Sequence, residues 1–200
     1  MIAIIDYDAG NIKSIEKALE FLGEDFVLTR DKDVLLSADK VILPGVGAFG
    51  DAMGKLTNYG LIPTIKKIIE KKTPFLGICL GLQLLFDSSE EAPGVSGLGI
   101  LPGKIVRFSE DSVKIPQIGW NKLSFPKKSP LFNGIEEGAF VYFVHSYYLV
   151  AEDFSDVAAV SEYGNTIHAA VCRDNIYACQ FHPEKSSETG LKIIKNFCDL

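Results

Sequence analysis

The sequence predicts an α/β protein with an open, mostly parallel sheet flanked by helices, and with additional antiparallel strands in the C-terminal half. Up to about residue 90, short apolar runs alternate with segments of helical spacing, a rhythm typical of βαβ units. Residues 94–178 instead carry short β-type runs broken by Gly, Pro and Asn, which favours antiparallel strands on the same core. No repeat or low-complexity linker interrupts the chain, so we expect residues 1–200 to form one domain.

The N-terminal part supplies the predicted parallel strands and most of the helices. Compact apolar runs predict buried strands at residues 2–5, 26–28, 41–43 and 75–78. Apolar spacing predicts helices at residues 12–22, at 61–69, and from residues 82–86 onward. Gly23 is a suitable C-cap for the first helix, and Pro63 falls in the first turn of the second, where proline is tolerated. A glycine-containing loop, residues 44–47, leaves the third strand.

The C-terminal half contributes further strands and a last helix. Alternating apolar runs predict strands at residues 140–144, 157–160 and 167–171, and a buried strand at 176–181. Residues 188–198 have helical spacing, and we expect Ser186 or Ser187 to cap this helix.

Composition and charge restrict the class of protein. With 47% hydrophobic and 23% charged residues, the chain is expected to be soluble and globular. The formal net charge of −6 would repel phosphates, so no nucleic-acid partner is expected. No stretch reaches the roughly 20 apolar residues of a membrane span, and Asp6 and Asp8 interrupt the N-terminus where a signal peptide would be apolar. We therefore expect a cytoplasmic protein that does not bind membranes.

The sequence predicts no metal site and no cofactor. The four cysteines form no C-x-x-C pair, and no group of residues has metal-ligand spacing. The glycines at 45 and 47 belong to neither a Walker motif nor a dinucleotide fingerprint. For Cys172, Cys179 and Cys198, a role as small buried hydrophobic residues is preferred.

Cys79 differs from the other cysteines because it lies in a predicted turn between a buried strand and a helix. Gly77 and Gly81, two residues before and two after it, would let strand and helix approach closely, as in the G-x-S-x-G nucleophile elbow. Such a turn exposes the thiol, places it at a helix N-terminus and directs the Leu80 N–H at a developing oxyanion. Taken alone, the motif supports a core cysteine and a nucleophile about equally.

The segment from His182 to Glu184 favours the nucleophile. Pro183 biases His182 toward an extended conformation, in which residues two apart point the same way. Glu184 could then accept a hydrogen bond from one imidazole nitrogen and leave the other for the thiol. Both Cys79 and His182 follow apolar strands, and ligand crevices of parallel sheets form outside the carboxyl ends of strands. We therefore predict a Cys79–His182–Glu184 triad.

Three other candidates carry less weight. His168 lies in an alternating strand pattern and is expected to be structural. Asp6 ends the first strand, where a turn role is the safer interpretation. His145 lies at a strand end and could line the pocket, and its role stays open.

Two motifs make the chain similar to the class I (triad) glutamine amidotransferases: residues 79–83 (CLGLQ) and 181–184 (FHPE). Within that family it most resembles the branch of glutaminase subunits of imidazole glycerol phosphate synthase. The segments that carry this closer resemblance span nearly the whole chain: DYDAGN (6–11), PGVGAFG (44–50), GWN (119–121), FVHSY (143–147) and HPEKSS (182–187).

The resemblance implies a role for each matching residue. Cys79 would attack the carboxamide of glutamine and form a glutamyl thioester, while His182 would protonate the departing ammonia and then activate water. The oxyanion would be bound by the Leu80 amide together with that of Val46 or Gly47. The remaining implied roles fall into two sets. The amino-acid end of glutamine would be held by Gln83, Ser146 and Tyr147, and a partner (β/α)₈-barrel cyclase would dock over Asn11, Trp120 and Lys185.

Alternative functions stay open at this point. Gln117 and Ile118 stand where the family more often has His-Met, in a segment that the resemblance places toward the partner. A paralogous amidotransferase that feeds ammonia to a surface-sugar synthase is therefore the nearest rival. A cysteine peptidase or DJ-1-like protein would share the elbow but generally lacks Gln83 and His-Pro-Glu. A pseudo-amidotransferase scaffold is disfavoured because all three triad residues are present.

Overall fold

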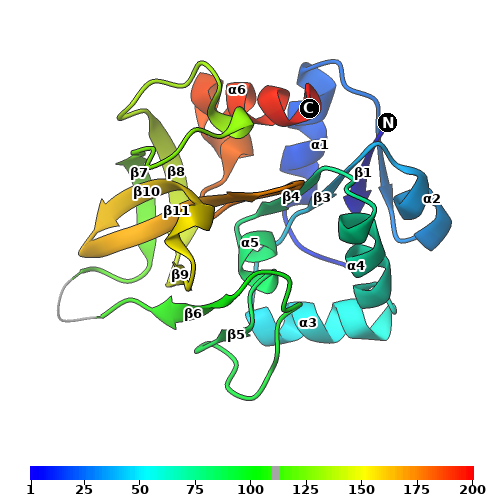
Figure 1. Ribbon diagram of the computed structural model, residues 1–200, viewed down its shortest axis with the longest axis horizontal. Coiled ribbons are helices and arrows are strands. Elements are labelled where there is room, and N and C mark those ends of the chain that lie inside the picture. Colours follow the sequence, from blue (N-terminus) through cyan, green and yellow to red (C-terminus); the bar gives the residue numbers. More distant parts are fainter. Residues whose placement is uncertain (110–112) are drawn as a thin grey trace.

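The computed structural model describes residues 1–109 and 113–200 and is organised around a seven-stranded sheet (Figure 1). The strand order is β10-β11-β12-β4-β3-β1-β2. The five parallel strands are β1 (Ile2–Ile5), β2 (Phe26–Thr29), β3 (Lys40–Leu43), β4 (Phe75–Ile78) and β12 (Ile176–Cys179). Two antiparallel strands, β10 (Val157–Tyr163) and β11 (Asn165–Arg173), extend the sheet beyond β12. The predicted fold class, mostly parallel with antiparallel additions, is confirmed.

Helices cover both faces of the sheet because successive strand residues point to opposite sides. Ile2 and Ile4 pack with helices α1 (Ile12–Phe21) and α6 (Ser187–Cys198). Ala3 and Ile5 pack on the other face, under four further helices. These helices are α2 (Lys32–Ser37), α3 (Phe49–Asn58), α4 (Ile62–Glu70) and α5 (Leu80–Leu84). Since both faces are buried, the strands are apolar throughout rather than alternating.

Two smaller sheets lie beside the main one. Strand β6 (Gly103–Arg107) pairs with β5 (Ser88–Ser89) and antiparallel with β9 (Tyr147–Ala151). Strands β7 (Gln117–Lys122) and β8 (Phe140–His145) form an antiparallel ribbon. Figure 1 shows this ribbon at the β10 end of the main sheet, away from β2. Three short 3-10 helices complete the fold: η1 (Pro130–Phe132), η2 (Phe154–Asp156) and η3 (Pro183–Lys185).

The expected strands, and the helices expected at residues 12–22, 61–69 and 188–198, are present with small shifts at their ends, but two helices were not predicted. The helix expected from residues 82–86 onward is wrong in its extent, because α5 begins at Leu80, directly after Cys79, and ends at Leu84. Helix α2 is capped by the preceding Asp31, whose carboxylate accepts from the Asp33 and Val34 N–H groups, a capping signal that is readable in the sequence. Helix α3 buries residues 49, 52, 53 and 56 at helical spacing, but Gly50 and Gly54 weaken its helix propensity. The last parallel strand also ends at Cys179, two residues earlier than expected, because the chain turns into η3.

The cap expected for α6 has a different chemistry. Ser186 is the N-cap residue, but its hydroxyl makes no capping bond. Instead, its Oγ donates to the His182 carbonyl at 2.7 Å and accepts from the Tyr142 N–H at 2.9 Å. Ser186 therefore ties η3, which carries Glu184, to strand β8.

Helix α6 approaches η3 so closely that only glycine fits at position 190. A Cβ atom there would lie 1.8 Å from the Pro183 carbonyl oxygen. By contrast, a Cβ at Gly54, in the exposed part of α3, would meet no atom within 4 Å.

We predict opposite stability effects for the same substitution at these two positions. Gly190→Ala must displace backbone and should lower the free energy of unfolding by about 1–3 kcal/mol or more. Gly54→Ala gains helix propensity without a clash and should raise it by up to about 1 kcal/mol. Urea unfolding of both variants measures this, and equal effects would contradict the close approach of α6 to η3.

Candidate active site

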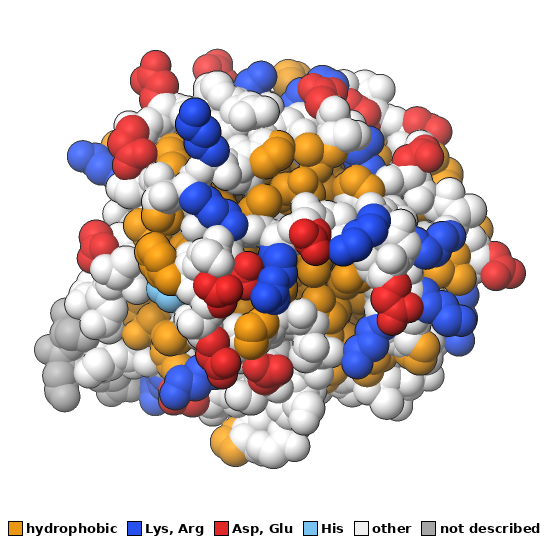
Figure 2. Space-filling view, in the orientation of Figure 1, with side chains coloured by type: hydrophobic (Ala, Val, Ile, Leu, Met, Phe, Trp, Pro, Cys, Tyr) orange, Lys and Arg blue, Asp and Glu red, His pale blue; other side chains and the backbone are white. Residues whose placement is uncertain are grey.

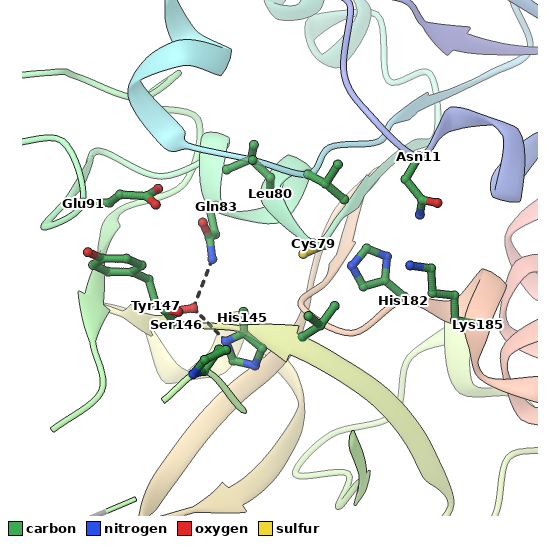
Figure 3. Close-up of a pocket in the computed structure, with 14 residues that line it drawn as sticks. Asn11, Cys79, Leu80, Gln83, Glu91, His145, Ser146, Tyr147, His182 and Lys185 are labelled. Atoms are coloured by element: carbon green, nitrogen blue, oxygen red, sulfur yellow. Dashed lines mark hydrogen bonds between the residues drawn. The ribbon is translucent and has the colours of Figure 1, made fainter. Parts of the chain in front are cut away.

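The candidate site lies at the carboxyl edge of the parallel strands, where loops from β1, β3, β4 and β12 converge. A pocket of about 470 Å³ opens there, and Cys79 and His182 of the predicted triad line it together with the residues predicted for substrate binding (Figure 3). Such a crevice is where open parallel sheets bind ligands. The structure brings together Cys79, Leu80, Val46, Gly47, Gln83, Ser146, Tyr147, His182, Asn11 and Lys185.

Cys79 forms a sharp and strained turn between β4 and α5. Its φ of 54° is unusual for a residue with a side chain and costs free energy that the surrounding packing must offset. The turn requires both flanking glycines: a Cβ at Gly77 would lie 2.8 Å from the Gly81 carbonyl oxygen, and one at Gly81 would lie 1.9 Å from the Leu43 carbonyl oxygen. The backbone geometry expected of a nucleophile elbow is therefore present, and Cys79, which is 6% exposed, lines the pocket.

His182 and Glu184 form a buried pair beside the sulfur. The His182 Nδ1 lies 2.7 Å from the Glu184 Oε1, and both side chains are almost fully buried. The other ring nitrogen, Nε2, makes no hydrogen bond with the described residues and is left for the thiol. Figure 3 shows the His182 ring next to the Cys79 sulfur.

This arrangement favours the charged form of the imidazole. Burial lowers the pKa of His182, but the neighbouring Cys79 and Glu184 groups outweigh it and raise the pKa to about 10. An imidazolium at His182 would stabilise negative charge on the neighbouring Cys79 sulfur. Burial, with a smaller contribution from the nearby Glu184 and Cys79, raises the pKa of Cys179 well above its usual range. Burial, with a smaller contribution from Glu24, raises the pKa of Cys198 to about 12, so these two thiols stay protonated.

Asn11 contacts the triad carboxylate, a role that its expected place at the partner surface did not suggest. Its Nδ2 donates to the Glu184 Oε1 at 3.1 Å, and its Oδ1 accepts from Ser14 at 2.8 Å. Asn11 precedes α1, so Glu184 lies at the positive end of that helix. The second carboxylate oxygen, Oε2, is buried and has no partner among the described residues. Glu184 also lines a cavity of about 10 Å³, which is room for one water molecule.

The segment that carries Asn11 is held by ion pairs. Arg30 donates to Asp6 and Asp8 at 2.7 Å each, and its guanidinium stacks on the Tyr59 ring. Asp6 has the expected turn role, since its Oδ1 accepts from the Asp8 N–H at 3.2 Å, and it also anchors this loop through Arg30.

The expected oxyanion donors do not form an open hole in this structure. The Leu80 N–H donates to the Gly45 carbonyl at 3.3 Å, so that carbonyl occupies the place where an oxyanion would bind. The C=O and N–H of a trans peptide point in opposite directions, so the Val46 N–H faces away from Leu80.

The opposite end of the pocket carries polar groups for an amino acid. The Gln83 Nε2 donates to the Tyr147 carbonyl and to the Gln180 Oε1, both at 3.1 Å. Glu91 also lines the pocket, and its Oε2 accepts from the Phe49 N–H at 2.8 Å. The sequence analysis did not single out Glu91, because its loop carries no recognisable motif. Its contact with the start of α3, at Phe49, is visible only in the structure.

His145, whose role was left open, lines the pocket as a neutral residue. Burial lowers its pKa to about 4, despite the Tyr147 carbonyl that accepts from it at 2.8 Å. It is thus no proton carrier at neutral pH. His168 contacts the fold only, since its Nδ1 accepts from the Ala151 N–H at 3.0 Å.

The third partner residue, Trp120, lies outside the pocket on the outer face of the β7–β8 ribbon. It is 49% exposed and is flanked on that face by the exposed Ile118 and Phe140. Lys185 lies at the pocket rim beside Asn11.

Within residues 1–109 and 113–200, no group of three His, Cys, Asp or Glu side chains could hold a metal ion. None of the helices in these residues is long and apolar enough to cross a membrane.

Comparisons with known proteins agree with this geometry. Residues 3–200 match the family model described as glutamine amidotransferase class-I. The chain is 51% identical to the imidazole glycerol phosphate synthase subunit HisH of Syntrophotalea carbinolica and 49% identical to that of Methanocaldococcus jannaschii, with 100% of each chain covered. Among solved structures, PurLQS from Thermotoga maritima superposes with a TM-score of 0.76 at 23% identity, over 99% of this chain and 97% of that one, and shows the same fold.

The family model covers almost every residue, and the chain is similar to the HisH subunits over their full length. The chain therefore belongs to the class-I glutamine amidotransferases, in the branch of imidazole glycerol phosphate synthase HisH subunits.

Proposed function

We propose that this chain is a glutaminase subunit that hydrolyses glutamine through a thioester at Cys79. Residues 1–200 would act as one glutaminase domain. The ammonia would pass to a partner cyclase that makes imidazole glycerol phosphate and AICAR in histidine biosynthesis. The observation that carries the proposal is one pocket in which Cys79 lies beside the buried His182–Glu184 pair. The names of the relatives, subunits of imidazole glycerol phosphate synthase, support the pathway.

The reaction needs each member of the triad in turn. The Cys79 thiolate attacks the carboxamide carbon, and the carbonyl oxygen becomes an oxyanion. The His182 imidazolium gives its proton to the departing nitrogen, so ammonia leaves and a glutamyl thioester stays on Cys79. Neutral His182 then takes a proton from water, which attacks the thioester and releases glutamate and the thiolate. Glu184 accepts a hydrogen bond from the Nδ1–H group throughout and holds the ring in orientation.

Recognition of the amino-acid end follows from the polarity of the pocket. Both donor positions of the Gln83 amide are already used, so its Oε1 is the atom left to accept from the substrate ammonium. The Glu91 carboxylate supplies the opposite charge for the same ammonium. The Ser146–Tyr147 segment is then the element for the substrate carboxylate.

Full activity would require the Gly45–Val46 peptide to rotate. Rotation removes the Gly45 carbonyl from the Leu80 N–H and turns the Val46 N–H toward the oxyanion. Each such donor contributes about 3–4 kcal/mol of transition-state stabilisation. A chain with the peptide as observed would be nearly idle, which limits the waste of glutamine.

The partner proposed is a (β/α)₈-barrel cyclase that docks over Asn11, Trp120 and Lys185. Trp120 lies in an exposed apolar patch with Ile118 and Phe140, and aromatic residues of this kind are typical anchors of interfaces. Asn11 links that surface to Glu184. Figure 2 shows charges of both signs interspersed over the face it presents, with no large region of a single sign.

One observation favours a second candidate, a paralogous amidotransferase that serves a surface-sugar synthase. Ile118, which departs from the usual family residue, is 62% exposed within the proposed docking patch, whereas Gln117 is buried beneath it. The synthase that co-purifies with the chain distinguishes the two candidates.

We predict that a glutamine-analogue alkylator modifies the native chain once, at Cys79, and that glutamine protects it. Cys79 alone of the four cysteines lines the pocket, whereas Cys172 is partly exposed elsewhere and Cys179 and Cys198 are buried and protonated. Mass spectrometry of peptides from the labelled protein measures this. Equal labelling of Cys172 would count against the assignment.

A second prediction separates the two other triad residues. His182→Ala removes the proton carrier and should lower kcat by about 10²–10⁴-fold. Glu184→Gln keeps an acceptor for Nδ1 but removes the charge, so its loss should be smaller. Steady-state glutamate release measures both, and an equal loss would show that Glu184 does more than orient the ring.

A third prediction concerns the complex. Glutamate release should be low for the chain alone, higher with the cyclase, and highest with the cyclase and its ligand. Trp120→Ala should weaken association at least tenfold, since a central aromatic anchor contributes about 2 kcal/mol or more. Phe154→Ala, which removes a similarly exposed aromatic outside the patch, is the control. Full activity of the isolated chain, unchanged by the cyclase, would favour an autonomous glutaminase.

A further inference from the structure

Gln180 is a fully buried side chain that the proposed reaction does not yet use. It directly follows β12, and its own N–H is bound to the Ala169 carbonyl at 2.8 Å. A buried amide costs free energy unless its polar atoms find partners. The two partners of Gln180 are both in the active site: its Nε2 lies 3.7 Å from the Cys79 sulfur, and its Oε1 accepts from Gln83 at 3.1 Å.

The orientation of the Gln83 and Gln180 side-chain amides is fixed by a third group, the Tyr147 carbonyl. The Tyr147 carbonyl can only accept, so the Gln83 amide must present its NH₂ group there. The second proton of that NH₂ group then points at Gln180, which must answer with its oxygen. The NH₂ group of Gln180 is left facing the sulfur. In the opposite orientation, two NH₂ groups would face each other and an oxygen would face the thiolate, so both contacts would be repulsive.

We infer that Gln180 is a catalytic hydrogen-bond donor that stabilises the Cys79 thiolate, and that Gln83 couples this donor to the substrate-binding end of the pocket. The inference rests on the proposed role of Cys79 as nucleophile. A thiolate accepts a hydrogen bond more strongly than a thiol does, so the donor favours ionisation. Because this donor belongs to Gln180 and not to His182, His182 stays free to protonate the departing nitrogen.

The same chain gives the bound substrate a way to act on the nucleophile. An ammonium that donates to the Gln83 Oε1 polarises that amide and strengthens its bond to Gln180. This in turn makes the Gln180 NH₂ a better donor to the sulfur, since consecutive hydrogen bonds reinforce one another. The thiolate is then most stable when an amino acid occupies the pocket.

The test is the pH dependence of Cys79 alkylation by iodoacetamide, followed at that residue by mass spectrometry. Gln180→Met keeps the length of the side chain and removes the donor. We expect the midpoint of its rate profile to move to higher pH by about one unit, a tenfold change in the ionisation constant, because hydrogen bonds to charged groups contribute about 1.5 kcal/mol or more. The limiting rate at high pH should be little changed. Gln117→Met, the same substitution at another buried glutamine, should leave the profile in place.

A superimposable profile for Gln180→Met, or an equal shift in Gln117→Met, would overturn the inference. If Gln180→Met does not fold, the wild-type chain provides the answer by NMR. The Gln180 side-chain NH₂ signals should then move with the ionisation of Cys79 while those of Gln117 do not, and signals that stay fixed would overturn it as well. Iodoacetamide needs no glutamine, so a chain that alkylates normally but releases no glutamate even with the cyclase and its ligand would contradict the proposed function rather than the role of Gln180.

Discussion

The sharp turn at Cys79 depends on one backbone contact, the approach of α5 to the end of β3 at Gly81. The space there is too small for any side chain, since a Cβ would lie 1.9 Å from the Leu43 carbonyl oxygen. This contact lets the helix start immediately after β4 and holds Cys79 at a φ of 54°. The strain is offset by the core on that face of the sheet, to which Leu80 and Leu43 both belong. Without it, the thiol would not point into the pocket, and the histidine that follows β12 would have no group to act on.

Burial of the His182–Glu184 pair is the second requirement, and the fold meets it with contacts from three directions. Asn11 contributes an N–H bond to the carboxylate from the start of α1. Ser186 binds the His182 carbonyl, and the His182 N–H donates to the Tyr142 carbonyl at 2.9 Å. Removing one partner of such a buried pair generally costs 3–5 kcal/mol, because the other charge is left without compensation. Loss of catalysis and loss of stability therefore have to be measured separately in variants of these residues.

The sequence was sufficient for the framework of the site but not for its hydrogen bonds. Apolar runs predicted the five parallel strands, and the order of the motifs placed Cys79 and His182 at strand ends, since both features are local patterns. Gln180 was not found, because a neutral amide next to a motif carries no signal until its partners across the sheet are known. The orientation of the Gly45–Val46 peptide was also beyond reach, since rotating it changes no residue and little of the surrounding fold. Ser186 was placed correctly, but its hydroxyl binds tertiary partners rather than the helix it precedes.

These features separate two requirements that a glutaminase must meet at the same time. The groups that would stabilise a negative charge on the Cys79 sulfur, His182 and, on our inference, Gln180, are already in place beside it (Figure 3). The oxyanion position is occupied by the Gly45 carbonyl, so the step that forms the oxyanion needs a rearrangement of the Gly45–Val46 peptide. The ribbon that carries Trp120 is well placed to connect the two. Trp120 pairs with Tyr142, and the Tyr142 carbonyl accepts the His182 N–H, so a protein docked on Trp120 lies one strand away from the triad backbone. On the proposed docking at Trp120, a shift of this ribbon would reach the His182 backbone through Tyr142, whereas Glu184 is held by Asn11 and the Cys79 turn by the contact at Gly81.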